Sequence, residues 1–367
     1  MSRKMSNQFE PNYAVPPGTT LAETIEALGM SQAELAQRMG RPSKTINEII
    51  NGKAAITPET ALQLEKVLGV PASFWNNAER EYRATLARQA NNQELAQCTE
   101  WLKQFPVKDM TKQGWISEGK TGGELVRTLL QYFGIASPEQ WKTFCLQQQG
   151  AYRQSPSFKS DPGAVSAWLR QGELAAQKIE CAPFDEAKFR AALREVRKLT
   201  VETPQVIGPE IRRICAASGV AFVFVPEVGK THVSGFTCWL TASKALIQQS
   251  LRHKSDDHLW FTFFHEAGHI LLHGKNDTFL EFDGQKDVKE DEANAFARDF
   301  LIPADAYAEF IRRQGGNISA ASILAFAREV EIAPGIVVGR LQKDGHVPWS
   351  MHNRLKIRLR LVNSNEE

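Results

Sequence analysis

The 367-residue sequence predicts an α+β protein with more than one domain. Apolar residues recur at helical spacing from Thr19 to about Ala90, and residues 91–205 continue in an irregular helical pattern. The period then changes, and residues 219–252 form short apolar runs separated by turn residues, which is typical of β-strands. A chain of this length is also too long for one ordinary core. We therefore expect an all-α N-terminal domain, a helical middle region and a C-terminal domain with a small β-sheet.

Composition and charge limit the classes of protein to which the chain can belong. Apolar residues make up 42% and charged residues 23%, as in globular proteins. The net charge of +2 gives no overall attraction to nucleic acid, so any DNA contact must come from a local patch. The five cysteines are scattered without a CxxC pair, which argues against a disulfide framework and a cysteine zinc site. We find neither a signal peptide nor an apolar run near the roughly 18 residues that span a bilayer, so we expect a cytoplasmic protein without membrane contact.

The changes of pattern divide the chain into five segments. Residues 1–16 hold prolines and polar residues with little periodicity and are expected to be a flexible arm. Residues 17–90 form a small helical domain, and residues 91–204 form a helical middle region whose role the sequence does not reveal. Residues 205–315 contain the strands and an apolar helix, and residues 316–367 form a helical extension that ends in a basic strand.

The N-terminal domain contains two short helices joined by a tight turn. Ser31 is the expected N-cap of the first helix, with Glu34 in the position that completes a capping box, and Gly40 ends this helix. Ser43 is the expected N-cap of the second helix, which ends at Asn51. On the second helix the isoleucines fall on one face and four polar residues on the other: Lys44, Asn47, Glu48 and Asn51. This arrangement is typical of a helix-turn-helix, although a small helical bundle with a solvated polar face would give the same pattern.

The phrase "TLAETIEALGMSQAELAQRMG…INEIINGKAAITPETALQLEKVLG" resembles the XRE (Cro/C1-type) helix-turn-helix family, and most closely its HigA branch of antitoxin-type repressors. The resemblance covers about residues 17–85 and implies a homodimer that binds double-stranded operator DNA with helix 43–51 in the major groove. It implies three side chains at base edges: Lys44, Asn47 and Asn51. It implies four at phosphates: Gln32, Ser43, Thr45 and Lys53. Antitoxins of this kind are short chains, whereas this chain carries nearly three hundred further residues.

The helix "WFTFFHEAGHILLHG", residues 260–274, places histidines in an otherwise apolar segment. His265 and His269 are four residues apart, so both can direct a ring nitrogen at one ion. Zn²⁺ accepts imidazole nitrogens, and catalytic zinc sites keep one position for water. Glu266 lies beside this point and suits a base that takes a proton from that water. The HExxH pattern therefore indicates a zinc peptidase site, with catalytic Glu266.

A third ligand must come from elsewhere in the chain. Leu272 and Lys275 occupy the positions where the long three-histidine zinc pattern needs Gly and His, so that class is excluded. His273 lies a further turn along the helix and is expected to border the site. The segment "EDEANAFARDFLIP", residues 290–303, offers a carboxylate on a second helix.

The helical wheel of the second segment favours Glu290 as the third ligand. Glu290 shares a face with Ala293, Asn294, Ala297 and Leu301, and the small residues on this face allow close approach to the first helix. Glu292 lies nearly opposite and stays as the alternative. Asn294 is placed to hold the second nitrogen of a ligating histidine.

The two segments together, "FTFFHEAGHILLHG…EDEANAFARDFLIP", resemble the ImmA/IrrE family of metallo-endopeptidases. The resemblance covers about residues 205–305 and implies a gluzincin-like core, a zinc ion, a peptide substrate along a sheet edge and a role in relieving repression. It implies that Glu266 activates the zinc-bound water. The combination with an XRE domain is common in this family, and a complete zinc site there does not guarantee proteolysis.

The chain end "RLKIRLRLV", residues 354–362, alternates basic and apolar residues and predicts a strand with one basic and one buried face. The basic face is either a charge-protected sheet edge or a surface for DNA or an acidic partner.

Three functions are compatible with these patterns. The first is a DNA-binding regulator whose zinc endopeptidase domain hydrolyses a repressor or antitoxin-type protein. The second is a non-catalytic HigA-like antitoxin or sensor in which the zinc domain binds a toxin or a ligand. The third is a peptidase whose N-terminal domain only docks proteins.

Overall fold

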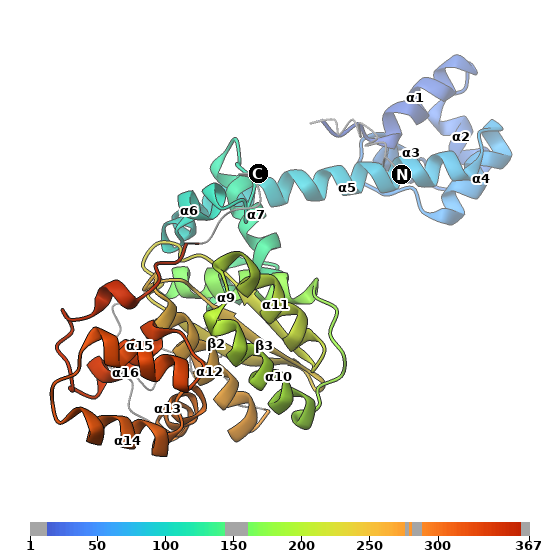
Figure 1. The fold of residues 1–367 in the computed structure, drawn as a ribbon. Coiled ribbons are helices and arrows are strands. Elements are labelled where there is room, and N and C mark those ends of the chain that lie inside the picture. The colour runs from blue at the N-terminus through green and yellow to red at the C-terminus, as the bar shows by residue number, and fades with distance from the viewer. Residues whose placement is uncertain (1–12, 144–160, 276–278, 281–287, 361–367) are drawn as a thin grey trace. The chain divides into compact units, whose positions relative to one another are not determined.

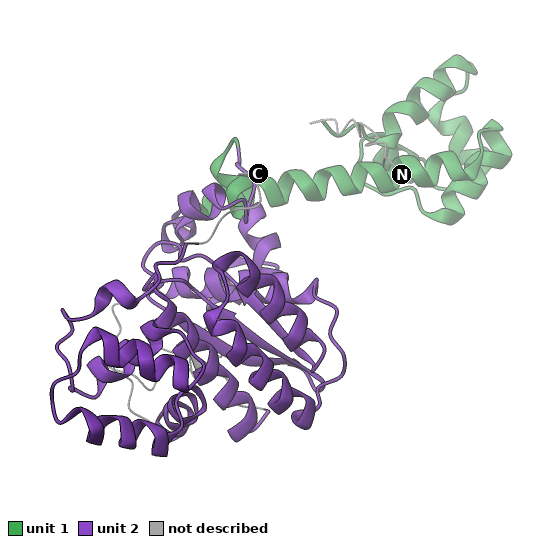
Figure 2. Cartoon of the chain, viewed as in Figure 1, with its two compact units in different colours: residues 1–99, 120–126 green, residues 100–119, 127–367 purple. Residues whose placement is uncertain are grey.

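The structure of the chain divides into two compact units (Figure 1 and Figure 2). Unit 1 comprises residues 1–99 and 120–126, and unit 2 comprises residues 100–119 and 127–367. The computed structural model describes residues 13–143, 161–275, 279–280 and 288–360. Most of the expected arm therefore lies outside the described residues.

Unit 1 is built from helices, as predicted. Its main elements are α1 (Pro17–Ala27), α2 (Gln32–Met39), α3 (Ser43–Ile50), α4 (Pro58–Leu68) and α5 (Ala72–Gln97). The apolar faces of these helices meet in one core, in which Leu35, Ile46 and Trp75 are fully buried. Helices α2 and α3 pack against each other across a short turn. The helix-turn-helix arrangement predicted from the sequence is therefore present.

The helix ends in unit 1 agree with the predicted caps except at α3. The Ser31 hydroxyl accepts a hydrogen bond from the Glu34 backbone N–H at 3.1 Å, and Gly40 ends α2 with a φ of 64°. The prediction that Ser43 is the N-cap of α3 is wrong, because Ser43 is already the first helical residue and Pro42 occupies the cap. Proline fits that position because its extended backbone, with φ near −61°, turns directly into the helix.

Unit 2 combines further helices with a small sheet, which confirms the predicted α+β class. In the described part of the chain after α5, the helices are η1 (Thr99–Gln104), α6 (Val107–Lys112), α7 (Gly122–Phe133), α9 (Pro162–Gln177), α10 (Glu186–Lys198), η2 (Leu199–Val201), α11 (Pro204–Ala216), α12 (Asp256–Leu272), α13 (Val288–Leu301), α14 (Ala304–Gln314), α15 (Ala320–Glu329), α16 (Pro334–Lys343) and η3 (Asn353–Leu355). Among the described residues, we find no helix with the length and apolar character needed to cross a lipid bilayer.

The sheet has the strand order β1-β3-β2-β4. Its members are β1 (Val220–Phe224), β2 (Gly235–Thr241), β3 (Lys244–Gln249) and β4 (Phe279–Leu280). Strand β1 runs parallel to β3, whereas β2 runs antiparallel to both β3 and β4. The predicted strand region between residues 219 and 252 is therefore confirmed.

Strands β1 and β3 are buried on both faces, and their side chains alternate between two cores. Phe222 and Ile247 belong to the core that contains the apolar side of α12. Ala221 and Leu246 point the other way, into the core formed with α9, where Trp168 is fully buried. Helix α12 thus lies on one face of the sheet, with α13 and α16 packed against it.

The predicted C-terminal basic strand is wrong. Residues 353–355 form the turn η3, and the following segment makes only an isolated bridge, between Ser255 and Arg358. Lys356 does not lie on an exposed basic face, because its ammonium is 2.6 Å from the Asp257 carboxylate. Ile357, predicted to be buried, is 43% exposed. Two buried carboxylates at the start of α12 hold this segment instead, since Asp257 pairs with Lys356 and Asp256 Oδ1 accepts a hydrogen bond from the Ile357 N–H. Residues 361–362 lie outside the described residues.

Candidate metal centre and nucleic-acid interface

Helices α12 and α13 approach each other closely enough to share a site. Gly268 of α12 lies against α13, and a Cβ built at this position would be 3.3 Å from the Cα of Ala293. Small residues on both sides therefore permit the close approach that the helical wheel predicted. The contact brings the histidines of α12 opposite the first turn of α13, and His265, His269 and Glu290 are all buried.

These three side chains form a compact cluster of ligand atoms. The Nε2 atoms of His265 and His269 are 3.0 Å apart, and they lie 3.1 and 3.6 Å from the two carboxylate oxygens of Glu290. A tetrahedral zinc ion with bonds of about 2.1 Å separates its ligand atoms by about 3.4 Å. The observed spacing and the nitrogen and oxygen donors therefore fit such an ion. Glu292, the alternative ligand, has a 54% exposed side chain and lies outside the cluster.

The protonation of the cluster also suits metal binding. Burial lowers the pKa of His269 to about 4, although the Glu290 carboxylate opposes this shift. Burial alone would raise the pKa of Glu290, but hydrogen bonds with His265 and His269 outweigh it and lower that pKa to about 2. At neutral pH His269 is thus uncharged and Glu290 is ionised, which are the forms that bind metal ions.

A second layer of side chains fixes the two histidine rings. His265 Nδ1 lies 3.1 Å from Asn294 Oδ1, which is the contact expected from the sequence. His269 Nδ1 lies 3.0 Å from His273 Nδ1, and His273 Nε2 lies 3.0 Å from a Glu292 oxygen. His273 therefore borders the cluster and supports His269 instead of joining it. Such contacts hold the Nε2 atoms towards the metal position.

Glu266, the expected base, lies on the side of α12 that faces the sheet and is fully buried. Its Oε2 accepts a hydrogen bond from the Thr237 hydroxyl at 2.5 Å. Its Oε1 lies against the backbone of β2, since a Cβ built on Gly235 would be 2.2 Å from this oxygen. Sequence reasoning missed both β2 residues. The alternation along β2 could have indicated them, because Gly235 and Thr237 point to the opposite face from Phe236 and Cys238.

The residues expected to contact DNA gather around α3 of unit 1. Six of the seven are exposed and one, Thr45, is half-buried; the exposed six are Gln32, Ser43, Lys44, Asn47, Asn51 and Lys53. Three of them form a chain of amides. Asn47 Nδ2 donates to Gln32 Oε1 at 3.4 Å, and Asn51 Nδ2 donates to Asn47 Oδ1 at 3.2 Å. The start of α2 and the polar face of α3 thus present one continuous polar surface.

Comparison with known families matches two parts of the chain. The family described as "Helix-turn-helix" matches residues 21–75, and the peptidase M78 family, described as "IrrE N-terminal-like domain", matches residues 223–342. The second match runs from β1 to α16 and includes the whole histidine and glutamate cluster.

Curated relatives are similar over short stretches. Virulence-associated protein A of Dichelobacter nodosus is 41% identical over 59 residues, which are 16% of this chain and 58% of that protein. The chain thus spans just over half the length of this relative. The uncharacterized HTH-type transcriptional regulator YddM of Escherichia coli K12 is 33% identical over 66 residues, 18% of this chain and 70% of that protein.

Two solved structures are also similar to a short part of the chain. An addiction module antidote protein of the HigA family from Coxiella burnetii is 32% identical and matches 22% of this chain and 90% of its own, with a TM-score of 0.22. The Pseudomonas aeruginosa antitoxin HigA, solved with the higBA promoter, is 28% identical with the same coverage and TM-score.

Proposed function

Because the chain belongs to the XRE-type helix-turn-helix family and carries an IrrE-like peptidase domain of family M78, we propose that it is a DNA-binding regulator with a zinc-dependent endopeptidase unit. The endopeptidase unit hydrolyses a peptide bond in a repressor or an antitoxin-type protein. The two activities belong to the two units: unit 1 selects an operator and unit 2 cuts a protein.

The buried cluster on α12 and α13 supports the peptidase assignment. His265, His269 and Glu290 would hold the zinc ion, which when bound supplies Lewis acidity and makes a water molecule a better nucleophile. Glu266 takes the proton from the attacking water and passes it to the leaving nitrogen of the peptide. The Thr237 hydroxyl keeps the Glu266 carboxylate in one orientation through its bond to Oε2.

The exposed surface around α3 supports the DNA-binding assignment. Lys44, Asn47 and Asn51 lie on the polar face of α3 and suit base edges in the major groove. Four neighbouring side chains suit phosphates and fix the position of the helix on the duplex: Gln32, Ser43, Thr45 and Lys53. By resemblance to XRE repressors we propose that two copies of the chain bind two half-sites.

The observation that carries the proposal is the buried, mutually hydrogen-bonded set of two imidazoles and one carboxylate beside Glu266. The test is a measurement of zinc content together with co-expression of the chain and candidate repressor or antitoxin proteins. We expect zinc at about one ion per chain and cleavage of one co-expressed protein, and the Glu266→Gln variant should keep the zinc and lose the cleavage. An unchanged cellular response in this variant would instead identify a non-catalytic sensor or antitoxin.

A further inference from the structure

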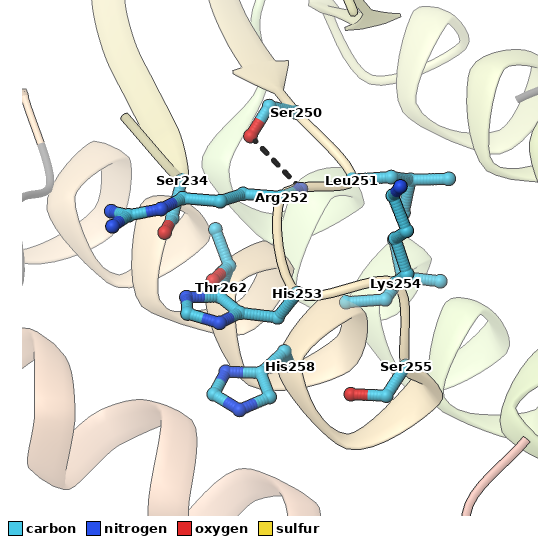
Figure 3. Close-up of a pocket in the computed structure, with 10 residues that line it drawn as sticks. Ser234, Ser250, Leu251, Arg252, His253, Lys254, Ser255, His258 and Thr262 are labelled. Atoms are coloured by element: carbon cyan, nitrogen blue, oxygen red, sulfur yellow. Dashed lines mark hydrogen bonds between the residues drawn. The ribbon is translucent and has the colours of Figure 1, made fainter. Parts of the chain in front are cut away.

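The side chains of the proposed peptidase site are closed off from solvent. His265, Glu266, His269 and Glu290 are each 4% exposed or less. The pocket drawn in Figure 3 lies before α12, and its lining reaches Thr262 but none of these four side chains. Hydrolysis needs the scissile carbonyl at the metal position and beside Glu266. Part of the surrounding structure must therefore move before a peptide can bind.

The outer edge of β2 is the sheet edge beside Glu266. The strand order β1-β3-β2-β4 leaves β2 covered on this side only by the two residues of β4. Thr237 of β2 donates its hydroxyl hydrogen to Glu266 Oε2, and Gly235 packs against the same carboxylate. An extended peptide that adds to a sheet edge is held by backbone hydrogen bonds. At this edge such a peptide would pass directly beside the expected base.

The backbone groups of Thr237 point to this outer edge. The Ser250 N–H donates to the Ser234 carbonyl at 3.0 Å, so the backbone of Ser234, just before β2, is directed at β3. Hydrogen-bonded and non-hydrogen-bonded pairs alternate along an antiparallel ladder. Phe236 is therefore also directed at β3, whereas Gly235 and Thr237 direct their N–H and C=O groups away from it. Thr237 thus holds Glu266 with its side chain and offers its backbone to a further strand.

Strand β4 takes the backbone groups of Thr237. It runs antiparallel to β2, with Phe279 opposite Thr237 and Leu280 opposite Phe236. By the same alternation, Thr237 and Phe279 form the hydrogen-bonded pair, and the Leu280 N–H points away from β2. A peptide that paired with Thr237 would need the same N–H and C=O groups. The peptide and β4 therefore cannot occupy this point of the edge together.

The contact between β2 and β4 is short enough to be replaced. Strand β4 has two residues, whereas β2 extends from Gly235 to Thr241. A peptide that pairs with more of β2 forms more backbone hydrogen bonds than β4 does, and so can compete with it. A short edge strand can also shield a sheet from other chains, but shielding alone does not require a position beside Glu266.

We propose that β4 is an autoinhibitory strand, which holds the edge of β2 in the place of a substrate and is displaced when a peptide binds. The inference rests on the proposed peptidase function and adds to it a regulation of the same site. The substrate is then an extended segment of a protein chain, held through its backbone along β2. A folded protein without such a segment does not displace β4 and is not cleaved.

Peptide binding tests the inference without hydrolysis. The probe is a twelve-residue peptide selected from a randomised pool on the zinc-loaded full chain that carries Glu266→Gln and Phe279→Pro. Its Kd is measured by fluorescence anisotropy. Proline at position 279 removes the N–H that pairs with Thr237. We therefore expect a Kd about ten-fold lower than for the chain with Glu266→Gln alone. The Thr237 amide hydrogen should exchange faster in the Phe279→Pro chain and slowly again once the peptide is bound.

Two variants are matched controls for the proline. Leu280→Pro adds the same ring at the residue whose N–H points away from β2, a position that an edge strand tolerates, and Phe279→Ala keeps the N–H. Both should bind the probe as the chain with Glu266→Gln alone does, with the same zinc content and thermal unfolding. If Phe279→Pro loses zinc, the double variant Phe279→Gly and Leu280→Gly replaces it, because glycine weakens a strand without removing an N–H, and it should also bind more tightly.

Each outcome decides the inference separately from the peptidase proposal. An equal Kd with and without the β4 substitutions, tighter binding in either control, or failure to select any peptide overturns it. If Phe279→Pro tightens binding but the chain with an intact Glu266 does not cleave the probe, the autoinhibitory strand stands and the peptidase proposal fails. If the chain cleaves a co-expressed protein and Phe279→Pro cleaves it no faster, the peptidase proposal stands and β4 is not inhibitory.

Discussion

Thr237 on β2 and Glu266 on α12 are 29 residues apart in sequence, and the Thr237 hydroxyl donates a 2.5 Å hydrogen bond to Glu266 Oε2. The bond is buried and joins the sheet directly to the expected base. A glutamate side chain has several rotatable bonds, and this contact selects one orientation of its carboxylate. Strand β2 therefore helps to build the site, although it supplies no metal ligand.

Loss of this hydrogen bond should slow the chemical step more than it weakens binding. We expect Thr237→Val to lower kcat by about 10- to 100-fold, as for removal of a buried hydrogen bond to a charged group, with little change in KM and in zinc content. Thr237→Ser keeps the hydroxyl and should retain most of the activity. A Thr237→Val protein with wild-type kcat would show that Glu266 is oriented by other contacts.

The two glutamates of α13 should differ sharply in their effect on zinc. Glu290 is buried within the cluster, whereas the Glu292 side chain is 54% exposed and contacts the outer histidine, His273. We expect Glu290→Gln to weaken zinc binding by at least about 100-fold, and Glu292→Gln to weaken it by about ten-fold or less. Competition with a coloured chelator measures both constants. Equal losses in the two variants would contradict the ligand assignment.

The stability of the metal-free protein should depend on pH through buried groups that act in opposite directions. Burial lowers the pKa of His269 from 6.5 to about 4, so between these values the unfolded chain takes up a proton that the native chain does not. Glu290, whose pKa is lowered from 4.5 to about 2, acts in the same direction at lower pH. Asp256 acts in the opposite direction, because burial raises its pKa from 3.8 to about 6.

A comparison of the wild type with the His269→Asn variant separates the effect of His269 from that of Asp256. Between pH 6.5 and pH 4 the shifts of His269 and Asp256 largely cancel, so we expect the urea midpoint of the chelator-treated wild type to fall only slightly. In His269→Asn, where the Asp256 shift is no longer opposed by His269, the midpoint should rise over the same range. The same pH dependence of the midpoint in both proteins would show that His269 does not contribute to it.

The spacing of residues along the sequence was enough to predict that the two histidines meet. Other parts of the site depend on contacts between segments that are distant in the sequence. The four-residue interval puts His265 and His269 on one face of any α-helix, and their rings are 4.6 Å apart. The role of Thr237 could not be predicted in the same way, because it depends on the register of a strand against a distant helix. The predicted C-terminal strand failed for a similar reason: alternation suggested an exposed Lys356, but its partner Asp257 lies about a hundred residues earlier.

DNA binding by the full chain should show two separable contributions from α3 and its surroundings. An operator obtained by selection from random duplexes is the probe. We expect Asn47→Ala to weaken binding by about 1–3 kcal/mol and to relax the preference at one base pair. Lys53→Ala should weaken all sequences alike and reduce the slope of log K against log salt by about one. Sequence-independent effects of both variants would contradict the assignment of Asn47 to a base edge.

Helix α16 packs against the start of α12 through glycine, and this contact should be sensitive to a single methyl group. A Cβ built on Gly339 would lie 2.7 Å from Asp257 Oδ2 and 2.9 Å from Asp257 Cβ, where no space exists for it. The Asp257 carboxylate is tied to Lys356 and cannot move away freely. We expect Gly339→Ala to lower the free energy of unfolding by about 1–3 kcal/mol.

Gly208 in α11 is the matched control for this prediction. It is also a helical glycine, but its added Cβ would lie 3.8 Å from a Phe224 ring carbon, an ordinary contact distance. Gly208→Ala should therefore raise the free energy of unfolding by about 0.4–1 kcal/mol, because alanine restricts the unfolded chain more than glycine does. Urea denaturation of both variants measures the difference. A Gly339→Ala protein at least as stable as Gly208→Ala would mean that α16 does not pack against Asp257 closely enough to exclude a methyl group.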